Sequence, residues 1–213
     1  DITVAVPGSQ LLVSDEYDFV QLNLADYGTA TMTVENRGAV QAGTIRLASG
    51  EGVATLNVRG AGSTVVSDQL DLGNMGFGTL HIAEGGYVQN QVARAGRFAG
   101  ADQPGSRLSV DQLYLGGQNT FAGGMARLDI RDAGHVEVAE QLVVWDDATV
   151  QLDDGQLAAA SIDHDHGGEF YFDAGRLQVG TFAGELLNAG GTLAPGPAAG
   201  ITTVSRHYFQ LPD

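Results

Sequence analysis

The chain has 213 residues, no cysteine, and a formal charge of −16 from 26 acidic residues and ten basic residues, all of them arginine. This charge would repel nucleic-acid backbones and anionic membranes, and the lack of cysteine excludes disulfide and thiolate chemistry. No apolar run approaches the ~18 residues of a membrane span, so the sequence predicts neither nucleic-acid binding nor membrane insertion.

Composition and the start of the chain favour a secreted globular protein. Hydrophobic residues make up 43%, enough for a core, and 31 glycines against five prolines indicate many tight turns. The length fits one large or two small domains, and the repeats described next favour a single domain, 1–213. Asp1-Ile2-Thr3 opens directly on alternating apolar residues, as in a mature chain whose signal peptide has been removed.

A four-residue alternation of polar and apolar side chains recurs along the chain. Its copies are Thr31-Met32-Thr33-Val34, Thr55-Leu56-Asn57-Val58, Thr79-Leu80-His81-Ile82 and Arg127-Leu128-Asp129-Ile130, whose starts differ by 24, 24 and 48 residues. A period of two is the signature of a strand with one buried face. Each copy is followed by a glycine-containing turn.

A second element follows each turn. It recurs as Thr44-Ile45-Arg46-Leu47, Gln69-Leu70-Asp71-Leu72, Gln112-Leu113-Tyr114-Leu115 and Gln141-Leu142-Val143-Val144, and a single inward valine precedes it at Val40, Val65, Val88 and Val136. The C-terminal third continues in shorter form, with a period near 20 residues. One repeat therefore consists of a strand, a glycine corner, an inward valine, a second strand and another corner.

A unit of this size cannot bury its hydrophobic stripe alone, whereas stacked units bury a continuous column. The sequence therefore predicts an all-β fold, a single parallel β-solenoid of about eight coils with almost no helix. At the ~4.8 Å spacing of strands, eight coils give a rod on the order of 40 Å long. A β-sandwich or jelly roll is the alternative, although neither requires repeats in register.

The spacing breaks once, between Leu70 and Leu113, which lie 43 residues apart where one coil of about 24 is expected. We expect an inserted loop near 95–107, with Arg94, Arg97 and Arg107 close together on it. Insertions in solenoids often collect on the binding face. These arginines are candidates for contacting an anionic glycan or an acidic subunit, and an ordinary surface excursion is the alternative.

A polar sequence at Asp163-His164-Asp165-His166 is the candidate metal site. Two histidines at i and i+2 on an extended chain point the same way, as a shared metal requires, but further ligands must come from another coil. A solvated turn is the simpler interpretation, and loose Ca²⁺ binding by the aspartates is the third. The sequence predicts no other cofactor.

An enzyme is the less favoured class. Glycoside cleavage needs two carboxylates about 5–9.5 Å apart, and Asp129 with Glu137, or Asp153 with Asp173, would fit this requirement. Such pairs arise by chance among 26 acids on a thin rod, and lysine, a common proton acceptor, is absent. The sequence therefore predicts no catalytic residues, with a polysaccharide lyase or hydrolase as the remaining enzymatic alternative.

Two aromatic residues are candidates for contact with sugars or a partner. Trp145 stands at the predicted end of a second strand, where it could equally cap the core. Tyr171 lies between the inward residues Phe170 and Phe172 and is therefore expected to face outward.

Both ends of the sequence are strand-like. Ile2, Val4 and Val6 lie at one end and Tyr208, Phe209 and Leu211 at the other. An uncovered edge strand invites another chain, so we expect head-to-tail self-association through these residues. A piece of a longer chain and an irregular loop cap are the alternatives.

The repeats resemble the β-strand repeats of autotransporter passenger domains and related surface proteins. The matching segments are Ala54-Thr55-Leu56-Asn57-Val58, and Gly190-Gly191-Thr192-Leu193-Ala194-Pro195-Gly196 ahead of Gly200-Ile201-Thr202-Thr203-Val204. The resemblance implies an exported right-handed β-helix with a structural or adhesive role. The expected function is therefore a secreted building block of an extracellular fibre, surface layer or adhesin, with a glycan-binding module as the alternative.

Overall fold

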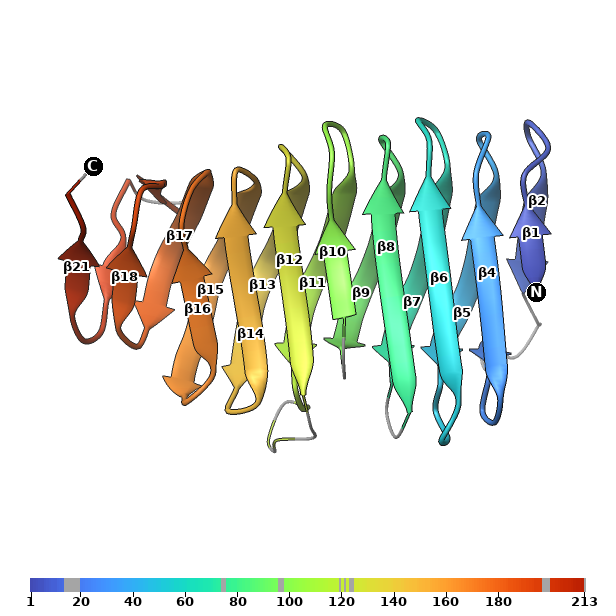
Figure 1. Cartoon of the computed structure of the whole chain (residues 1–213), viewed down its shortest axis with the longest axis horizontal. Helices are drawn as coiled ribbons and strands as arrows, with labels where there is room; N and C mark the ends of the chain where they lie inside the picture. Colours follow the sequence, from blue (N-terminus) through green and yellow to red (C-terminus); the bar gives the residue numbers. More distant parts are fainter. Residues whose placement is uncertain are drawn as a thin grey trace.

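The computed structural model describes residues 1–13, 20–73, 76–95, 98–118, 120, 122, 125–196 and 200–212. Within these residues the chain forms strands joined by turns, without helix. The strands form two sheets. In each sheet the strands follow one another along the same axis, which gives an elongated rod with the two termini at opposite ends (Figure 1).

Sheet A contains one short strand from each coil. Its strands, in spatial order, are β1 (Ile2–Val4), β4 (Thr29–Val34), β6 (Val53–Arg59), β8 (Phe77–Ala83), β10 (Phe98–Ala101), β12 (Ala126–Arg131), β14 (Ala148–Asp153), β16 (Glu169–Phe172), β18 (Leu186–Asn188) and β21 (Tyr208–Gln210).

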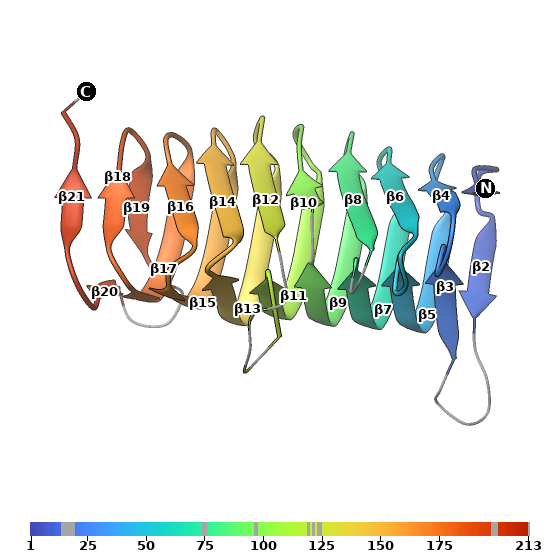
Figure 2. The same ribbon diagram turned by 60° about the horizontal axis from the view of Figure 1, so that its bottom comes forward.

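Sheet B contains the long strands of the rod together with short strands near its two ends, and it lies behind sheet A in Figure 1 and below it in Figure 2. They are β2 (Gln10–Val13), β3 (Gln21–Leu24), β5 (Ala39–Leu47), β7 (Thr64–Leu72), β9 (Tyr87–Ala95), β11 (Arg107–Leu115), β13 (His135–Trp145), β15 (Gln156–His166), β17 (Arg176–Ala183), β19 (Thr192–Pro195) and β20 (Thr203–Val204). The ladder skips one residue in the middle of the long strands, for example between the pairs Ala42↔Ser67 and Thr44↔Gln69. Strand β13 skips two residues, between Val138 and Gln141, and the register shifts there.

Paired strands in both sheets run parallel, which confirms the β-solenoid and excludes the sandwich and the jelly roll, whose sheets are antiparallel. The sequence repeats match the register. Thr31, Thr55 and Thr79 lie opposite one another in sheet A, and Val40, Val65 and Val88 do so in sheet B. The inward valines are thus part of the long strands, not isolated steps between two strands.

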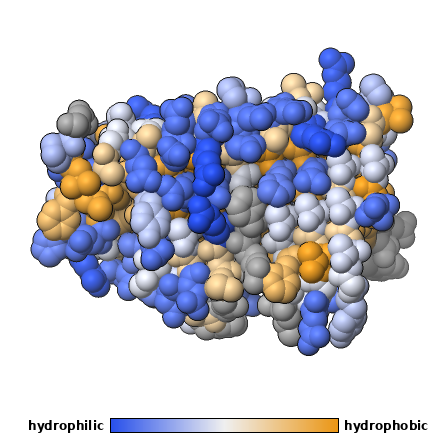
Figure 3. Space-filling model, in the orientation of Figure 1, coloured by the Kyte–Doolittle hydropathy of each residue, from blue (hydrophilic) through white to orange (hydrophobic). Residues whose placement is uncertain are grey.

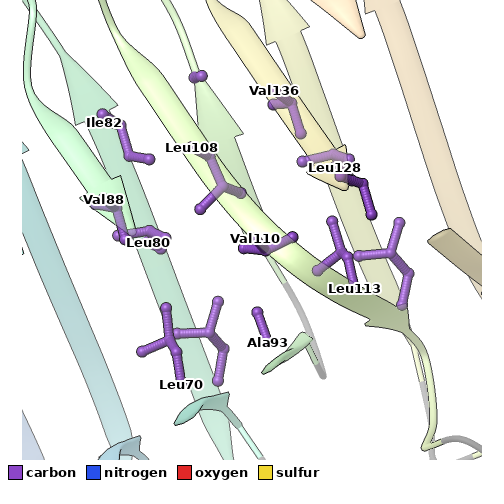
Figure 4. Packing of buried hydrophobic residues seen from close by; sticks show 14 of the residues in the cluster. Leu70, Leu80, Ile82, Val88, Ala93, Leu108, Val110, Leu113, Leu128 and Val136 are labelled. Carbon is purple, nitrogen blue, oxygen red and sulfur yellow. The ribbon is translucent and has the colours of Figure 1, made fainter. Parts of the chain in front are cut away.

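The core lies between the two sheets and runs the length of the rod. Side chains from successive strands of both sheets point toward one another in it, as Leu80 and Leu128 of sheet A and Leu70 and Leu113 of sheet B do in Figure 4. Each of these four leucines is at most 1% exposed. Because a fully buried leucine contributes about 1.5–3 kcal/mol, this repeated burial is the main term that favours the folded chain.

In the stretch 95–107, where the sequence predicts an inserted loop, residues 98–107 instead supply a regular part of a coil. Strand β10 pairs with β8 on one side and with β12 on the other, and β11 begins at Arg107. The 43 residues from Leu70 to Leu113 therefore hold two coils. The sequence Phe98-Ala99-Gly100-Ala101 lacks the polar and large apolar alternation of the other sheet A strands, which is why the repeat pattern misses it.

The C-terminal end of the core is closed by a polar network around Asn188. This residue is 1% exposed and lies between Phe172 and Gln210 in the register of sheet A. Its amide donates to the carbonyl of Gly191 at 2.9 Å and to Gln210 Oε1 at 2.9 Å, and its Oδ1 accepts from the backbone of Gly190 and Gly191. The inward apolar row thus ends in a buried amide with paired polar groups.

Glycine is required where the chain turns from sheet A into sheet B. A Cβ on Gly134 would lie 2.1 Å from the carbonyl oxygen of Ala101 in the preceding coil, and one on Gly86 would lie 2.3 Å from that of Val58. Both contacts are with backbone, so a side chain at either position forces adjacent coils apart.

We predict that Gly134→Ala lowers the free energy of unfolding by about 3 kcal/mol, because the clash falls on a backbone carbonyl that cannot move independently. Gly43→Ala is the matched control, since its Cβ would meet only the Val20 carbonyl oxygen at 3.2 Å, and the expected loss is within about 1 kcal/mol. Urea denaturation followed by circular dichroism measures both. Equal losses would contradict the close coil contact at Gly134.

Candidate functional site

The outer face of sheet A displays rows of side chains that run along the rod. Because alternate residues of a strand point outward and the strands stack in register, equivalent positions form one line. The middle row of this face consists of Thr33, Asn57, His81, Gly100, Asp129, Gln151, Tyr171, Leu187 and Phe209. Residues two positions before and after each member form the two flanking rows.

A charged group, here called the central cluster, consists of Arg127, Asp129 and Arg131 on β12. Alternation along the strand brings these three side chains to the outer face. The Nε of Arg127 donates to both carboxylate oxygens of Asp129, at 2.9 and 3.0 Å, and Arg131 donates to Oδ1 at 3.3 Å. The Asp129 side chain is only 13% exposed, while the two arginines are 46% and 44% exposed.

The hydrogen bond to Asp129 raises the pKa of Arg127 above its ordinary value, and burial opposes the shift. The carboxylate thus pairs with two guanidinium groups at once. Their remaining N–H groups face solvent and are available to a ligand. Figure 3 shows strongly hydrophilic side chains gathered in a band near the middle of this face.

A depression of about 120 Å³ adjoins the central cluster. Its lining residues are His81, Ile82, Gly100, Asp102, Asp129 and Arg131. Gly100 lies in the middle row between His81 and Asp129 and has no side chain, so the row is interrupted there. The depression therefore combines an imidazole, two carboxylates and a guanidinium above a buried strand.

On the other side of the cluster the row continues through Gln151 to Tyr171, which is 43% exposed. A hydrogen bond from the phenol to Glu169, together with the charge of that carboxylate, raises the pKa of Tyr171 above 10.0. The phenol therefore remains protonated at physiological pH. Gln151 donates to the carboxylate of Asp173 in the opposite flanking row.

Together these side chains present fixed donors and acceptors beside an aromatic ring, which is chemistry suited to hydroxyl groups. Of this site the sequence pointed to Tyr171, whose outward position agrees with the burial of Phe170 and Phe172. Asp129 was considered only as one member of a carboxylate pair that could arise by chance. The signal that would have found the cluster is Arg127-Leu128-Asp129-Ile130-Arg131, since period-two alternation places all three charges on one face.

Of the three arginines predicted to form a patch, Arg94 and Arg107 do not come together. Arg94 and Arg107 lie near opposite ends of the sheet B strands, because Arg107 is in register with Tyr87 and Arg94 with Tyr114. Arg94 pairs with Asp71 at 3.1 Å, and Arg107 pairs with Glu137. Arg97 lies outside the described residues.

Trp145 ends β13, as the repeat predicts, and its indole donates to the carbonyl of Gln118 at 2.8 Å. One face of its ring stacks on His166, with the ring centroids 4.1 Å apart. The indole is therefore held by the chain itself.

The side chains predicted as metal ligands interact with different partners. His166 lies 3.3 Å from Asp163, Asp165 pairs with Arg206 at 2.8 Å, and His164 packs against Phe170 and Phe182. Within the described residues, His, Asp and Glu do not form a group of three or more arranged to hold a metal ion.

The two carboxylate pairs weighed for glycoside cleavage also differ. Asp129 lies on sheet A and Glu137 on sheet B, so they do not share a face. Asp153 and Asp173 are neighbours at the C-terminal ends of β14 and β16 in sheet A, where the backbone N–H of Asp173 donates to the carbonyl of Leu152 at 3.1 Å.

No known protein family, curated protein or solved structure matches the chain. The resemblance to autotransporter passenger repeats therefore stays a prediction. In the described part of the chain, no helix has the length and apolar character needed to cross a membrane.

Two half-buried histidines make stability depend on pH. Burial is the main cause that lowers the pKa of His164 and of His135 below 6.5, and the charge of Arg107 adds to the effect at His135. His164 donates from Nε2 to the carbonyl of Gly168 at 2.7 Å, and its buried Nδ1 has no hydrogen-bond partner among the described residues. Protonating Nδ1 would leave a buried donor unpaired.

We predict that the free energy of unfolding is highest above pH ~6.5 and falls as the pH drops through this value toward the lower pKa of the folded state. In that window the unfolded chain binds more protons than the folded chain. Urea denaturation at a series of pH values measures this. The double variant His135→Gln, His164→Phe should lose the decline, and an unchanged decline would assign it to other groups.

Proposed function

We propose that the protein is an extracellular adhesive β-solenoid that holds a glycan along the outer face of sheet A. The observation that carries this proposal is the depression above Gly100, which Asp129, Arg131 and His81 line and from which a row of polar and aromatic side chains continues toward the C-terminal end. Binding sites combine concave shape with a few placed polar groups, and both features are present here.

The rigidity of the face supports binding of an extended polymer. Parallel pairing fixes neighbouring positions of a row at the ~4.8 Å spacing of strands, so the donors and acceptors are ordered before a ligand arrives. A polymer lying along the rod can then contact several coils at once. Repeated weak contacts of this kind add up to firm adhesion.

The charges favour a neutral glycan. Arg127 and Arg131 are already paired with Asp129, while Glu169 and Asp173 add negative charge to the same face. With a formal charge of −16, the chain would repel an acidic polysaccharide at long range. Neutral sugars provide hydroxyl groups that both donate and accept, and so they fit carboxylates and guanidinium groups equally.

We predict that Asp129→Asn weakens glycan binding about tenfold or more, because the amide lacks the negative charge and the second acceptor oxygen that hold the two guanidinium groups in the cluster. Affinity electrophoresis against a panel of neutral and acidic polysaccharides, followed by calorimetry on the best ligand, measures this. Asp111→Asn is the matched control, since Asp111 is an exposed residue of sheet B. Equal binding by both variants would refute the site, and a panel without any ligand would refute the function.

End-to-end self-association is the second candidate function. Among the described residues, β1 and β21 each pair on one side only. Ile2, Tyr208, Phe209 and Leu211 are 37–46% exposed, and Val6 is 70% exposed. Val4, by contrast, is buried at 7% exposure and belongs to the core of its own chain.

Two features of the C-terminal end oppose growth from it. The polar network around Asn188 closes the inward row, and Pro195, on the edge strand β19, has no N–H to offer a further strand. We therefore rank adhesion through the face of sheet A above assembly through the ends.

We predict that the chain sediments as one species over a hundredfold dilution, measured by sedimentation velocity. The double variant Ile2→Asp, Leu211→Asp should behave like the parent chain, because neither residue is needed for the face of sheet A. Concentration-dependent filaments that this variant abolishes would instead establish end-to-end assembly as the primary function.

A further inference from the structure

We infer that the C-terminal part of the middle row is a stacking platform for a linear β-1,4-linked polymer of pyranose sugars. This inference rests on the proposed glycan-binding function and names the class of glycan. It concerns Tyr171, Leu187 and Phe209, which succeed one another on β16, β18 and β21.

These three side chains form an exposed apolar line. They are 43%, 45% and 46% exposed, although each belongs to a strand whose inward neighbours are packed in the core or in the Asn188 network. His207 widens the platform, because its ring stacks on Phe209 with the centroids 5.8 Å apart and the planes at 26°. Figure 3 shows hydrophobic residues gathered at this end of the face.

The platform is too narrow for a second protein. A stable protein interface buries ~800 Å² on each partner, far more than three half-exposed side chains in a single row supply. Its borders are also polar: Glu169, Glu185 and His207 lie in one flanking row, and Asp173 lies in the other. Two apolar residues, Ala189 and Leu211, also lie in this second row, and Leu211 is at the extreme end of the rod.

A narrow apolar strip between acceptors matches one kind of sugar. A pyranose with equatorial substituents presents flat C–H faces and a rim of hydroxyl groups. The faces would lie on Tyr171, Leu187 and Phe209, while the rim hydroxyls would donate to Glu169 and Asp173. A β-1,4 linkage keeps successive rings extended in a ribbon that can follow the row, whereas an α-1,4 linkage coils the chain away from a straight platform.

The platform is continuous with the central cluster. Gln151 follows Asp129 in the middle row and directly precedes Tyr171, so one straight ligand can reach both regions. The phenol of Tyr171 lies beside the carboxylate of Glu169, which raises its pKa. The cluster would thus fix the polymer through hydroxyl groups, and the platform would select the shape of its backbone.

Isothermal titration calorimetry with cellohexaose and maltohexaose tests the inference, since both are glucose hexamers that differ in linkage. We expect cellohexaose to bind more tightly. Tyr171→Ala and Phe209→Ala should each weaken its binding ~3- to 10-fold, the range of a single aromatic contact. Tyr27→Ala, which removes an 81% exposed aromatic ring near the opposite end of the rod, is the control and should bind as the parent does.

Circular dichroism of each variant checks the fold. If Tyr171→Ala perturbs the strand, Tyr171→Phe serves in its place, since it keeps the aromatic ring and should retain cellohexaose binding. Equal affinity for the two hexamers, or unchanged binding by the alanine variants, would overturn the platform. If Asp129→Asn still weakened glycan binding in that case, the proposed glycan-binding function would stand without the stacking platform. The absence of binding to either hexamer and to the whole polysaccharide panel would overturn both.

Discussion

Parallel strand pairing between successive coils is the constraint on which the rest of the structure depends. It sets one spacing for the whole rod and forces equivalent residues into straight rows. The turn glycines follow from it, because at Gly86 and Gly134 the preceding coil's carbonyl lies where a Cβ would be. The same pairing also aligns the outward side chains of sheet A into rows, and the central cluster lies across these rows.

Two polar residues of the inward rows of sheet B are joined by a hydrogen bond between neighbouring coils. Ser67 and Asn90 are about 5% and 4% exposed in a row that also holds Ala42 and Val110, and the Asn90 amide donates to the Ser67 hydroxyl at 2.6 Å. Asn188 is likewise hydrogen-bonded at the C-terminal end. Because an unpaired buried polar group costs about 1–3 kcal/mol, these hydrogen bonds offset much of the cost of placing polar side chains in the core, although the Oδ1 of Asn90 has no partner among the described residues.

The sequence was sufficient for the fold class and for most coils, since alternation and the repeated leucine and valine positions depend only on local chemistry. It was insufficient at β10, where Gly100 and Ala101 carry no alternation and only the neighbouring coils define the strand. The predicted arginine patch failed for a related reason: proximity in sequence at Arg94 and Arg107 does not mean proximity in a coil. Tyr171 could be placed because two buried phenylalanines flank it.

On such a scaffold, departures from regularity distinguish one part of the surface from another. A row of similar side chains makes a flat, evenly hydrated surface, whereas one glycine in the row opens a depression, as Gly100 does between His81 and Asp129. A change of side-chain type along the row, as from the polar Gln151 to the aromatic Tyr171, likewise makes one part of the surface different from its neighbours. The strand that the repeat pattern describes least well therefore creates the most distinctive part of the surface. Departures from a repeat should accordingly be sought first when binding sites are inferred on solenoids.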